Sequence, residues 1–455
     1  MSVITSQDRM DSGQQVNGAV IRGAIVAALG SFLFGFDTAV ISGTTTDLRE
    51  VFSLSSGELG FTVAIALMGT VIGSLMVGTP VDRYGRKPVM LVLALLYFFS
   101  ALGCALAWNW HSLLFFRFIG GLGVGAASVV SPMYIAEIAP PRQRGRLVAT
   151  SQMNIVLGIL VAYFSNFLMT SFATGDHLWR WMLGIEAIPA VLFIIMLFTI
   201  DESPRFLVKS NREEEATKVL GRLGARNPEV LLNEIKVSLA GEQNDADERF
   251  FQRKYLTPIL LAIMVATFNQ FAGINALIYY TADIFKMAGA EQTSALFQSV
   301  LIGVTNLVLT MIAMIVIDHF GRRNLLLVGS AGLTVCLLMV AYGFTYAGGG
   351  AIVVTGLIGY IAFFAFSQGA VIWVYLSEIF PNKVRARGQA LGSFTHWFWC
   401  AAVSWSFPVI ADFSKAGPFL FFAFMMVLQF FMVWKFLPET KGVSLEEIQK
   451  KLGIS

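Results

Sequence analysis

The chain alternates between long apolar runs and short polar connections. A window of about 19 residues separates twelve apolar segments. Each is close to the roughly 20 residues that an α-helix needs to cross the hydrocarbon core of a bilayer. We therefore predict an all-α polytopic membrane protein with twelve transmembrane helices. Their predicted limits are 20–42, 60–80, 88–108, 113–135, 147–170, 181–200, 257–280, 295–317, 325–346, 351–376, 389–411 and 417–437.

One connection, residues 201–256, is polar throughout and much longer than the others. It carries short helical patterns and separates six predicted spans from six, so we predict a cytoplasmic helical linker between two halves. The predicted division is an N-terminal six-helix bundle over 1–200, the linker over 201–256, a C-terminal six-helix bundle over 257–440 and a cytoplasmic tail over 441–455.

Composition supports this interpretation. The chain is 56% hydrophobic and 13% charged, with mean hydropathy +0.69, whereas a soluble domain carries about twice that charged fraction. The net charge of +3 does not indicate a nucleic-acid partner. Most of the 32 lysines and arginines fall in loops on the side of the N-terminus, which predicts that both termini are cytoplasmic. Arg117 lies within a span, and the loops of the opposite side hold only Arg49, Arg180, Lys286 and Lys415.

Three loop motifs of the first half return in the second half in the same order. DRYGRK (82–87) returns as DHFGRR (318–323), EIAPPRQRGR (137–146) as EIFPNKVRARG (378–388), and DESPR (201–205) as PETKG (438–442). This recurrence indicates two parallel six-helix bundles. We expect the charged residues of these loops to form a gating network on the cytoplasmic rim, which latches the bundles in one state and breaks in the other. The candidates are Asp82, Arg86, Glu137, Arg144, Glu202, Asp318, Arg322, Glu378, Arg385 and Glu439.

Asp37 lies inside the first span, in the stretch FGFDTAVISG. A carboxylate at that depth should face a cavity or a cation. Counted at ~1.5 Å per helical residue, Arg117 of the fourth span and Glu186 of the sixth lie in the same layer. A static Asp37–Arg117 pair that only holds helices together is one interpretation. The other is a proton site, in which protonated Asp37 releases Arg117; Glu186 is either a second proton site or a satisfied buried carboxyl.

Side-chain amides are concentrated in spans where few are expected. An amide donates and accepts hydrogen bonds at once, as a ring of sugar hydroxyls requires, although amides also join membrane helices. Gly273 in the seventh span predicts local unwinding of that helix. The amides are Gln152 and Asn154 in the fifth span, Asn269, Gln270 and Asn275 in the seventh, and Asn306 in the eighth.

Together these features resemble the sugar porter family of the major facilitator superfamily. The resemblance rests on the paired GR[KR] loops, on ESPR, PETKG and GINALIYY (273–280), and it runs from about residue 20 to 445. It implies two six-helix bundles that alternate access to a central site. Members similar to the bacterial proton-linked xylose and galactose symporters carry an Asp at the FG[FY]D position and an Arg before the GG of the fourth span. Here these are Asp37 and Arg117; facilitative members lack the acid.

The resemblance also implies a sugar site. The sugar-binding amides of the family match Gln152, Gln270 and Asn275, with Asn306 joining them, and its aromatic lining matches Phe34, Tyr279 and Trp373.

Three departures from the family pattern fall in this site, and they leave the identity of the sugar open. Asn269 stands where a glutamine is frequent. Gly369 is followed by Ala in place of Pro, which predicts a less kinked tenth span. His396 replaces an amide before Trp397. The imidazole of His396 is a hydroxyl partner, a pH-sensitive element or a packed ring.

The predicted function is import of a monosaccharide, a hexose or a pentose, by proton symport with alternating access. A facilitative sugar or polyol uniporter, a sugar sensor and an organic-ion antiporter are the alternatives. The sequence lacks a nucleophile–base pair, a metal-ligand cluster and a phosphate-cradling loop, so neither an enzyme nor a cofactor or metal is predicted. The expected partners are a sugar, protons and the lipid bilayer, for a monomer in the plasma (inner) membrane.

Overall fold

The structure is a computed structural model that describes residues 16–172, 177–244, 250–346, 349–443 and 445–453. The described residues are helical apart from short connections. Eleven of the helical segments are long and apolar enough to cross a membrane. The one remaining predicted span, 389–411, corresponds to α21, which is equally long but less apolar because it carries His396 and several serines. The all-α architecture with twelve spans is therefore confirmed.

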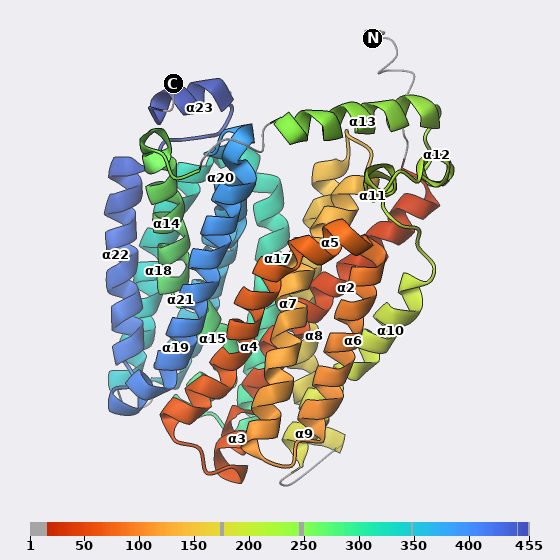
Figure 1. Ribbon diagram of the computed structural model, residues 1–455. Coiled ribbons are helices and arrows are strands. Elements are labelled where there is room, and N and C mark those ends of the chain that lie inside the picture. Colours follow the sequence, from red (N-terminus) through yellow and green to blue (C-terminus); the bar gives the residue numbers. More distant parts are fainter. Residues whose placement is uncertain (1–15, 173–176, 245–249, 347–348, 444, 454–455) are drawn as a thin grey trace.

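The first six spans form the half drawn from red to yellow in Figure 1. Their helices are α2 (Gly18–Val40), α4 (Ser56–Met76), α6 (Arg86–Ala105), α7 (Trp110–Ile138), α8 (Arg144–Phe172), and the pair α9 (Leu178–Gly184) and α10 (Ala187–Leu197). Short helices at the span ends are α3 (Thr45–Val51) and α5 (Gly78–Tyr84), with the 3₁₀ turn η1 (Ile41–Gly43).

The last six spans form the half drawn from green to blue. Their helices are α14 (Leu256–Phe271) with α15 (Ile274–Tyr279), α17 (Gln292–Phe320), α18 (Arg322–Thr345), α19 (Gly350–Phe366) with α20 (Gln368–Glu378), α21 (Arg385–Phe413) and α22 (Gly417–Phe436). The short elements are η2 (Arg253–Tyr255), α16 (Thr281–Met287) and η3 (Asn382–Val384).

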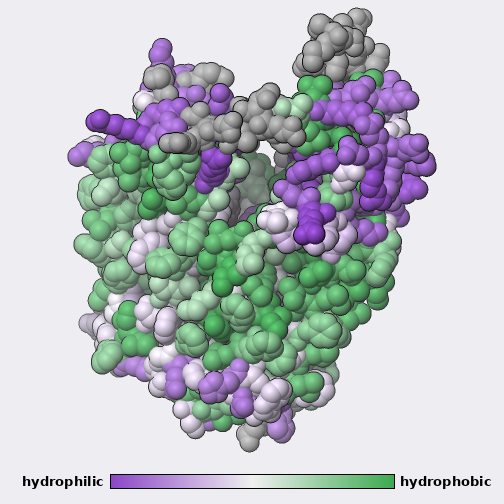
Figure 2. Space-filling view, in the orientation of Figure 1, coloured by the Kyte–Doolittle hydropathy of each residue, from purple (hydrophilic) through white to green (hydrophobic). Residues whose placement is uncertain are grey.

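The polar connection between the halves contains three helices, α11 (Pro204–Lys209), α12 (Glu213–Arg222) and α13 (Pro228–Asn244). They lie at the same end of the molecule as α23 (Leu445–Lys451), and we call this end the linker face (Figure 1). The end that carries α3 and α9 is the opposite face. Figure 2 shows an apolar belt between two polar ends, and a hollow that enters between the halves from the linker face.

Three spans are interrupted where a functional side chain is expected. Gly273 breaks the seventh span with φ of 90°, a left-handed conformation that favours glycine, as its position predicted. Ile185 and Glu186 separate α9 from α10. The tenth span is broken at Ser367, between α19 and α20. The tenth span is thus interrupted even though Ala370 stands where the family has proline.

Small residues let the helices of the N-terminal half approach closely. A Cβ built on Gly121 of α7 would overlap the backbone oxygen of Ala66 on α4, whereas one built on Gly123 would lie 3.5 Å from Leu96 Cβ, an ordinary contact. The two glycines are two residues apart on one helix, but only Gly121 faces the α4–α7 contact. This close packing fixes the position of α7, and with it the position of Arg117.

We expect Gly121→Ala to destabilise the protein by about 3 kcal/mol, because overpacking against a backbone that cannot move aside is costly. Gly123→Ala is the matched control and should leave stability unchanged or slightly raised, since helical alanine replaces glycine without a clash. Thermal unfolding of the two purified variants in detergent measures the difference. Equal melting temperatures would contradict the close packing of α4 on α7.

Candidate functional site

A buried ion pair joins α2 to α7. Arg117 Nη1 donates to Asp37 Oδ1 at 2.8 Å, and the two side chains are 2% and 7% exposed. The predicted proximity of these residues is therefore present in the structure. Helix packing accounts for it, because the site faces Gly120, where a Cβ would lie 3.7 Å from Asp37 Oδ1. A pair so shielded from water interacts far more strongly than a surface pair.

Glu186 lies at the break between α9 and α10 and is also buried. Its carboxylate is within electrostatic range of both Asp37 and Arg117. Its Oε1 has no hydrogen-bond partner among the described residues, so the interpretation of Glu186 as a fully satisfied buried carboxyl does not agree with the contacts found. Two buried carboxyl groups thus lie near one buried guanidinium, and the ion pair that this guanidinium forms among the described residues is with Asp37.

The amides of the seventh span form a connected group, which we call the amide cluster: Asn269, Gln270 and Asn275. Gln270 is its centre. Its Nε2 lies 3.1 Å from Asn269 Oδ1, and its Oε1 accepts from Asn275 Nδ2 at 2.8 Å. The unwound turn at Gly273 allows Asn275 to reach back to Gln270, which a continuous helix would not.

His396 of α21 extends the amide cluster. Both ring nitrogens lie close to Gln270 Nε2, at 3.1 and 3.2 Å, and the imidazole is buried. It also lies between two indoles, with ring centroids 5.1 Å from Trp373 and 4.9 Å from Trp397. These contacts agree with a packed ring, and the role of His396 as a partner for sugar hydroxyls stays a prediction.

Aromatic rings from both halves meet beside the amide cluster. Phe34 of α2 lies 5.6 Å from Trp397 of α21, measured between ring centroids. Trp373 of α20 is 38% exposed, an unusual state for a tryptophan between helices. Gly369, one turn earlier on α20, is half-buried. This surface offers an apolar platform next to amides, the combination that a sugar ring requires.

Other predicted site residues form no hydrogen bond to the amide cluster within the described part of the chain. Gln152 is half-buried on α8 of the other half. Asn306 of α17 is buried and accepts from Thr310 Oγ1 at 3.5 Å. Tyr279 is 3% exposed and belongs to an apolar core that both halves contribute to.

The predicted gating network is formed separately within each half. Arg86 makes a bidentate pair with Glu137 at 2.8 and 2.7 Å. Arg322 does the same with Glu378 at 3.2 and 3.0 Å. Glu202 accepts the backbone N–H groups of Arg86 and Lys87, as Glu439 does for those of Arg322 and Arg323. Burial raises the pKa of Glu202, although these hydrogen bonds act to lower it.

The remaining network candidates are peripheral. Asp82 pairs with Lys209 at 3.0 Å on the surface, Arg144 is exposed, and Arg385 Nε donates to the backbone oxygen of Phe380 at 3.4 Å. The side chain of Asp318 lies outside the described residues. Every ion pair found between described residues on the linker face joins elements of the N-terminal half and linker, or elements of the C-terminal half. Among the ion pairs of these described residues, none forms the expected latch between the halves in this state.

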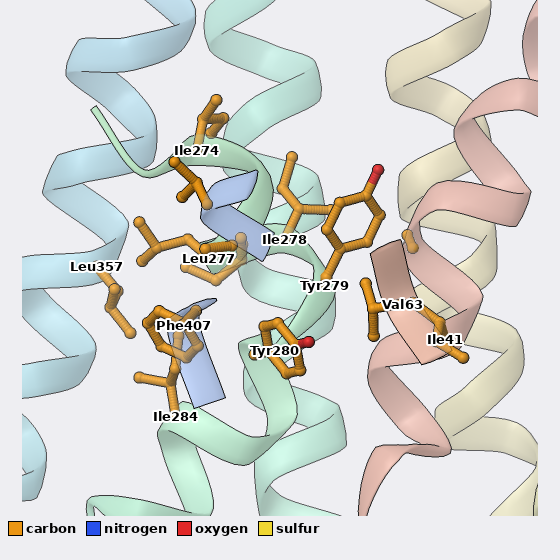
Figure 3. Packing of buried hydrophobic residues seen from close by; sticks show 14 of the residues in the cluster. Ile41, Val63, Ile274, Leu277, Ile278, Tyr279, Tyr280, Ile284, Leu357 and Phe407 are labelled. Atoms are coloured by element: carbon orange, nitrogen blue, oxygen red, sulfur yellow. The ribbon is translucent and has the colours of Figure 1, made fainter. Parts of the chain in front are cut away.

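The halves close against each other at the opposite face instead. An apolar core shared by both halves contains Ile41, Val63, Tyr279 and Tyr280, which Figure 3 shows meeting between the red and green ribbons. Tyr163 of α8 donates to the backbone oxygen of Ile278 at 2.8 Å across the same boundary.

Polar contacts surround this apolar core. Thr46 Oγ1 donates to Asp283 Oδ1 at 3.0 Å and accepts from Lys286 Nζ at 2.8 Å. Burial raises the pKa of Asp283. Ser56 is hydrogen-bonded to Asp412, also across the boundary. The sequence analysis missed these residues, because isolated threonines, serines and acids at span ends carry no recognisable pattern.

Two six-helix halves, closed at one face and hollow at the other around a polar site, define a secondary transporter rather than an enzyme. The family model described as "Sugar (and other) transporter" matches residues 23–452. The chain belongs to that family, the sugar porters of the major facilitator superfamily.

Its relatives support the same assignment. The chain is 36% identical to the D-xylose-proton symporter of Escherichia coli (strain K12) over an alignment 464 positions long, which covers 93% of this chain and 94% of the relative. It is 36% identical to the arabinose-proton symporter of Bacillus subtilis (strain 168) over 440 residues, 95% of each chain. It is also 34% identical to the glucose facilitated diffusion protein of Zymomonas mobilis subsp. mobilis, over 96% of this chain and 98% of that one.

Solved structures agree with the fold. The inward open conformation of the xylose transporter XylE from E. coli matches with a TM-score of 0.85 and 35% identity, covering 95% of this chain and 99% of that chain.

Proposed function

We propose that the chain imports a pentose or hexose by proton symport across the plasma membrane. The buried Asp37–Arg117 pair carries the proposal. Facilitated diffusion does not require an ionisable acid at that depth, and such a group is costly to keep there. The names of the E. coli and B. subtilis relatives, which specify xylose or arabinose together with a proton, support the same conclusion.

The linker face is cytoplasmic, and both termini lie on that side. The excess of lysine and arginine in the loops of this face supports the orientation, since cytoplasmic loops retain these residues. The hollow in Figure 2 then opens inward, in agreement with the match to an inward open structure. Because one chain contains both halves and the whole site, it functions as a monomer.

In this mechanism Asp37 is the proton carrier. Protonation from outside removes its charge and releases the guanidinium of Arg117, and deprotonation inside restores the pair. Sugar hydroxyls bind the amide cluster with Gln152 and Asn306, while Trp373 supports an apolar face of the ring. The contacts that close the opposite face stabilise one end state, and the charge networks of the linker face stabilise the other.

Purified protein in proteoliposomes tests the proposal. Uptake of D-xylose, L-arabinose, D-glucose and polyols is measured with and without an imposed pH gradient, acidic outside. We expect accumulation above the external concentration for at least one pentose or hexose, only with the gradient. Uptake that equilibrates without ever accumulating would replace symport by facilitated diffusion, the activity named for the Z. mobilis relative.

A further inference from the structure

Three buried polar atoms next to the Asp37–Arg117 pair have no hydrogen-bond partner among the described residues. They are Arg117 Nε, Glu186 Oε1 and the hydroxyl oxygen of Tyr97. The three side chains come from α7, from the α9–α10 break and from α6. Tyr97, Arg117 and Glu186 are 0%, 2% and 3% exposed, so bulk water does not satisfy them.

Tyr97 brings its ring to the same face of α7 as the ion pair. A Cβ built on Gly123 would lie 3.8 Å from Tyr97 Cδ2, and one built on Gly120 would lie 3.7 Å from Asp37 Oδ1. Successive turns of α7 therefore contact Tyr97 and Asp37. Tyr97 lies within electrostatic range of both Asp37 and Glu186.

The three atoms have complementary hydrogen-bonding properties. A guanidinium Nε–H only donates, an ionised carboxylate only accepts, and a phenol does both. Native structures rarely leave such groups unpaired, and here three of them belong to side chains that interact electrostatically around one ion pair. A water molecule makes about three hydrogen bonds when it is buried among polar groups. It can accept from Arg117 Nε, donate to Glu186 Oε1 and pair with the Tyr97 hydroxyl.

We propose that these atoms hold an ordered water between Glu186 and the Asp37–Arg117 pair, and that Tyr97 is a positioning residue for proton transfer. The inference rests on the proposed proton symport. The O–H bond of protonated Asp37 breaks as its proton passes to the water oxygen, and one of the water's own protons bonds to Glu186 Oε1. Asp37 becomes the carboxylate that pairs with Arg117, Glu186 becomes the neutral acid, and the water is regenerated.

Several titratable and charged groups face this site and set its pH dependence. They come from every element packed around it: Asp37 of α2, Tyr97 and Cys104 of α6, Arg117 of α7, Glu186 at the α9–α10 break and Tyr279 of α15. Tyr97 and Tyr279 can each lose a polar atom while keeping the ring and without changing a charge, but of the two only Tyr97 has a hydroxyl without a partner among the described residues. It is therefore the most specific probe of the proposed water.

The test compares Tyr97→Phe with the wild type in proteoliposomes, with D-xylose and L-arabinose as probes. We expect the initial rate of sugar-driven proton entry to fall about tenfold, as loss of one hydrogen bond within a charged network does. The pH profile of uptake should also shift. Sugar exchange without net proton movement should stay within about twofold, which shows that the variant is folded.

Tyr375→Phe is the matched control. The Tyr375 hydroxyl is also fully buried and without a partner among the described residues, but it lies on α20 of the other half. Removing it should change neither proton entry nor the pH profile. A second variant, Glu186→Gln, should lower proton entry, and the double variant should lower it no further, because both changes remove the same water.

Wild-type proton entry in Tyr97→Phe would overturn the water site while leaving symport intact. Additive losses in the double variant would overturn it as well. Exchange without any sugar-driven proton entry in the wild-type protein would overturn proton symport itself, and this inference with it.

Discussion

We expect Asp37→Asn to abolish proton-driven accumulation of sugar and to preserve sugar exchange. With one proton carried per sugar, a gradient of about two pH units supports roughly 100-fold accumulation at equilibrium. The variant should reach a ratio of about one. Asparagine has nearly the size of aspartic acid and keeps an acceptor for Arg117, but it cannot bind or release a proton.

Exchange survives because the neutral amide resembles protonated Asp37, a state that the transport cycle already visits. Removing one partner of a buried ion pair is normally destabilising, but Glu186 lies within electrostatic range of Arg117 and leaves it near a carboxylate. The measurement is uptake and exchange of radiolabelled sugar in proteoliposomes, with an imposed gradient for the first and none for the second.

The chain offers a matched control in Asp201→Asn. Asp201 also pairs with an arginine at 2.8 Å, Arg222, but this pair is exposed on the linker face. Exposed pairs contribute little, so accumulation should remain at the wild-type level. Undiminished accumulation in Asp37→Asn would exclude Asp37 as the proton site. Loss of exchange as well, in folded protein, would favour the static pair that only joins α2 to α7.

Much of the fold was predictable because the bilayer imposes it. Every span must be long, apolar and hydrogen-bonded within itself, so the twelve segments could be identified from hydropathy alone. The proximity of Asp37 and Arg117 followed from depth along two helices, since a buried acid requires a nearby cation. The two halves contain equivalent ion pairs, Arg86 with Glu137 and Arg322 with Glu378, because the loops that carry these residues are repeated.

The conformational state could not be predicted in the same way. Inward- and outward-facing states contain the same helices and differ by a few kcal/mol in contacts at the two faces. Nothing in the pattern of Thr46 or Asp283 indicates which face is closed. The break at Ser367 was not predicted, because proline is not required for a break: α7 and α21 continue through Pro132 and Pro408, whereas the tenth span is interrupted without a proline. The Tyr97 hydroxyl, which has no partner among the described residues, was not predicted either, because an aromatic residue in an apolar span ordinarily belongs to the packed core.

Gln270→Leu should weaken sugar binding by about 100-fold. Gln270 is the residue through which Asn269, Asn275 and His396 are connected, and in the proposed sugar site its amide supplies a donor and an acceptor. Leucine fills a similar volume and supplies neither. Loss of two or three hydrogen bonds of about 1 kcal/mol each, together with the disorder of Asn275, corresponds to this change in affinity.

Equilibrium binding of D-xylose, L-arabinose and D-glucose to purified protein measures the effect, and Gln429→Leu is its control. Gln429 is also a buried amide of the C-terminal half, but it accepts from Gln368 Nε2 at 2.9 Å and has no contact with the amide cluster among its described bonds. Its loss should lower stability and leave sugar affinity within about twofold. Equal affinities in the two variants would mean that Gln270 joins helices, as Gln429 does, and that the sugar is bound elsewhere in the hollow.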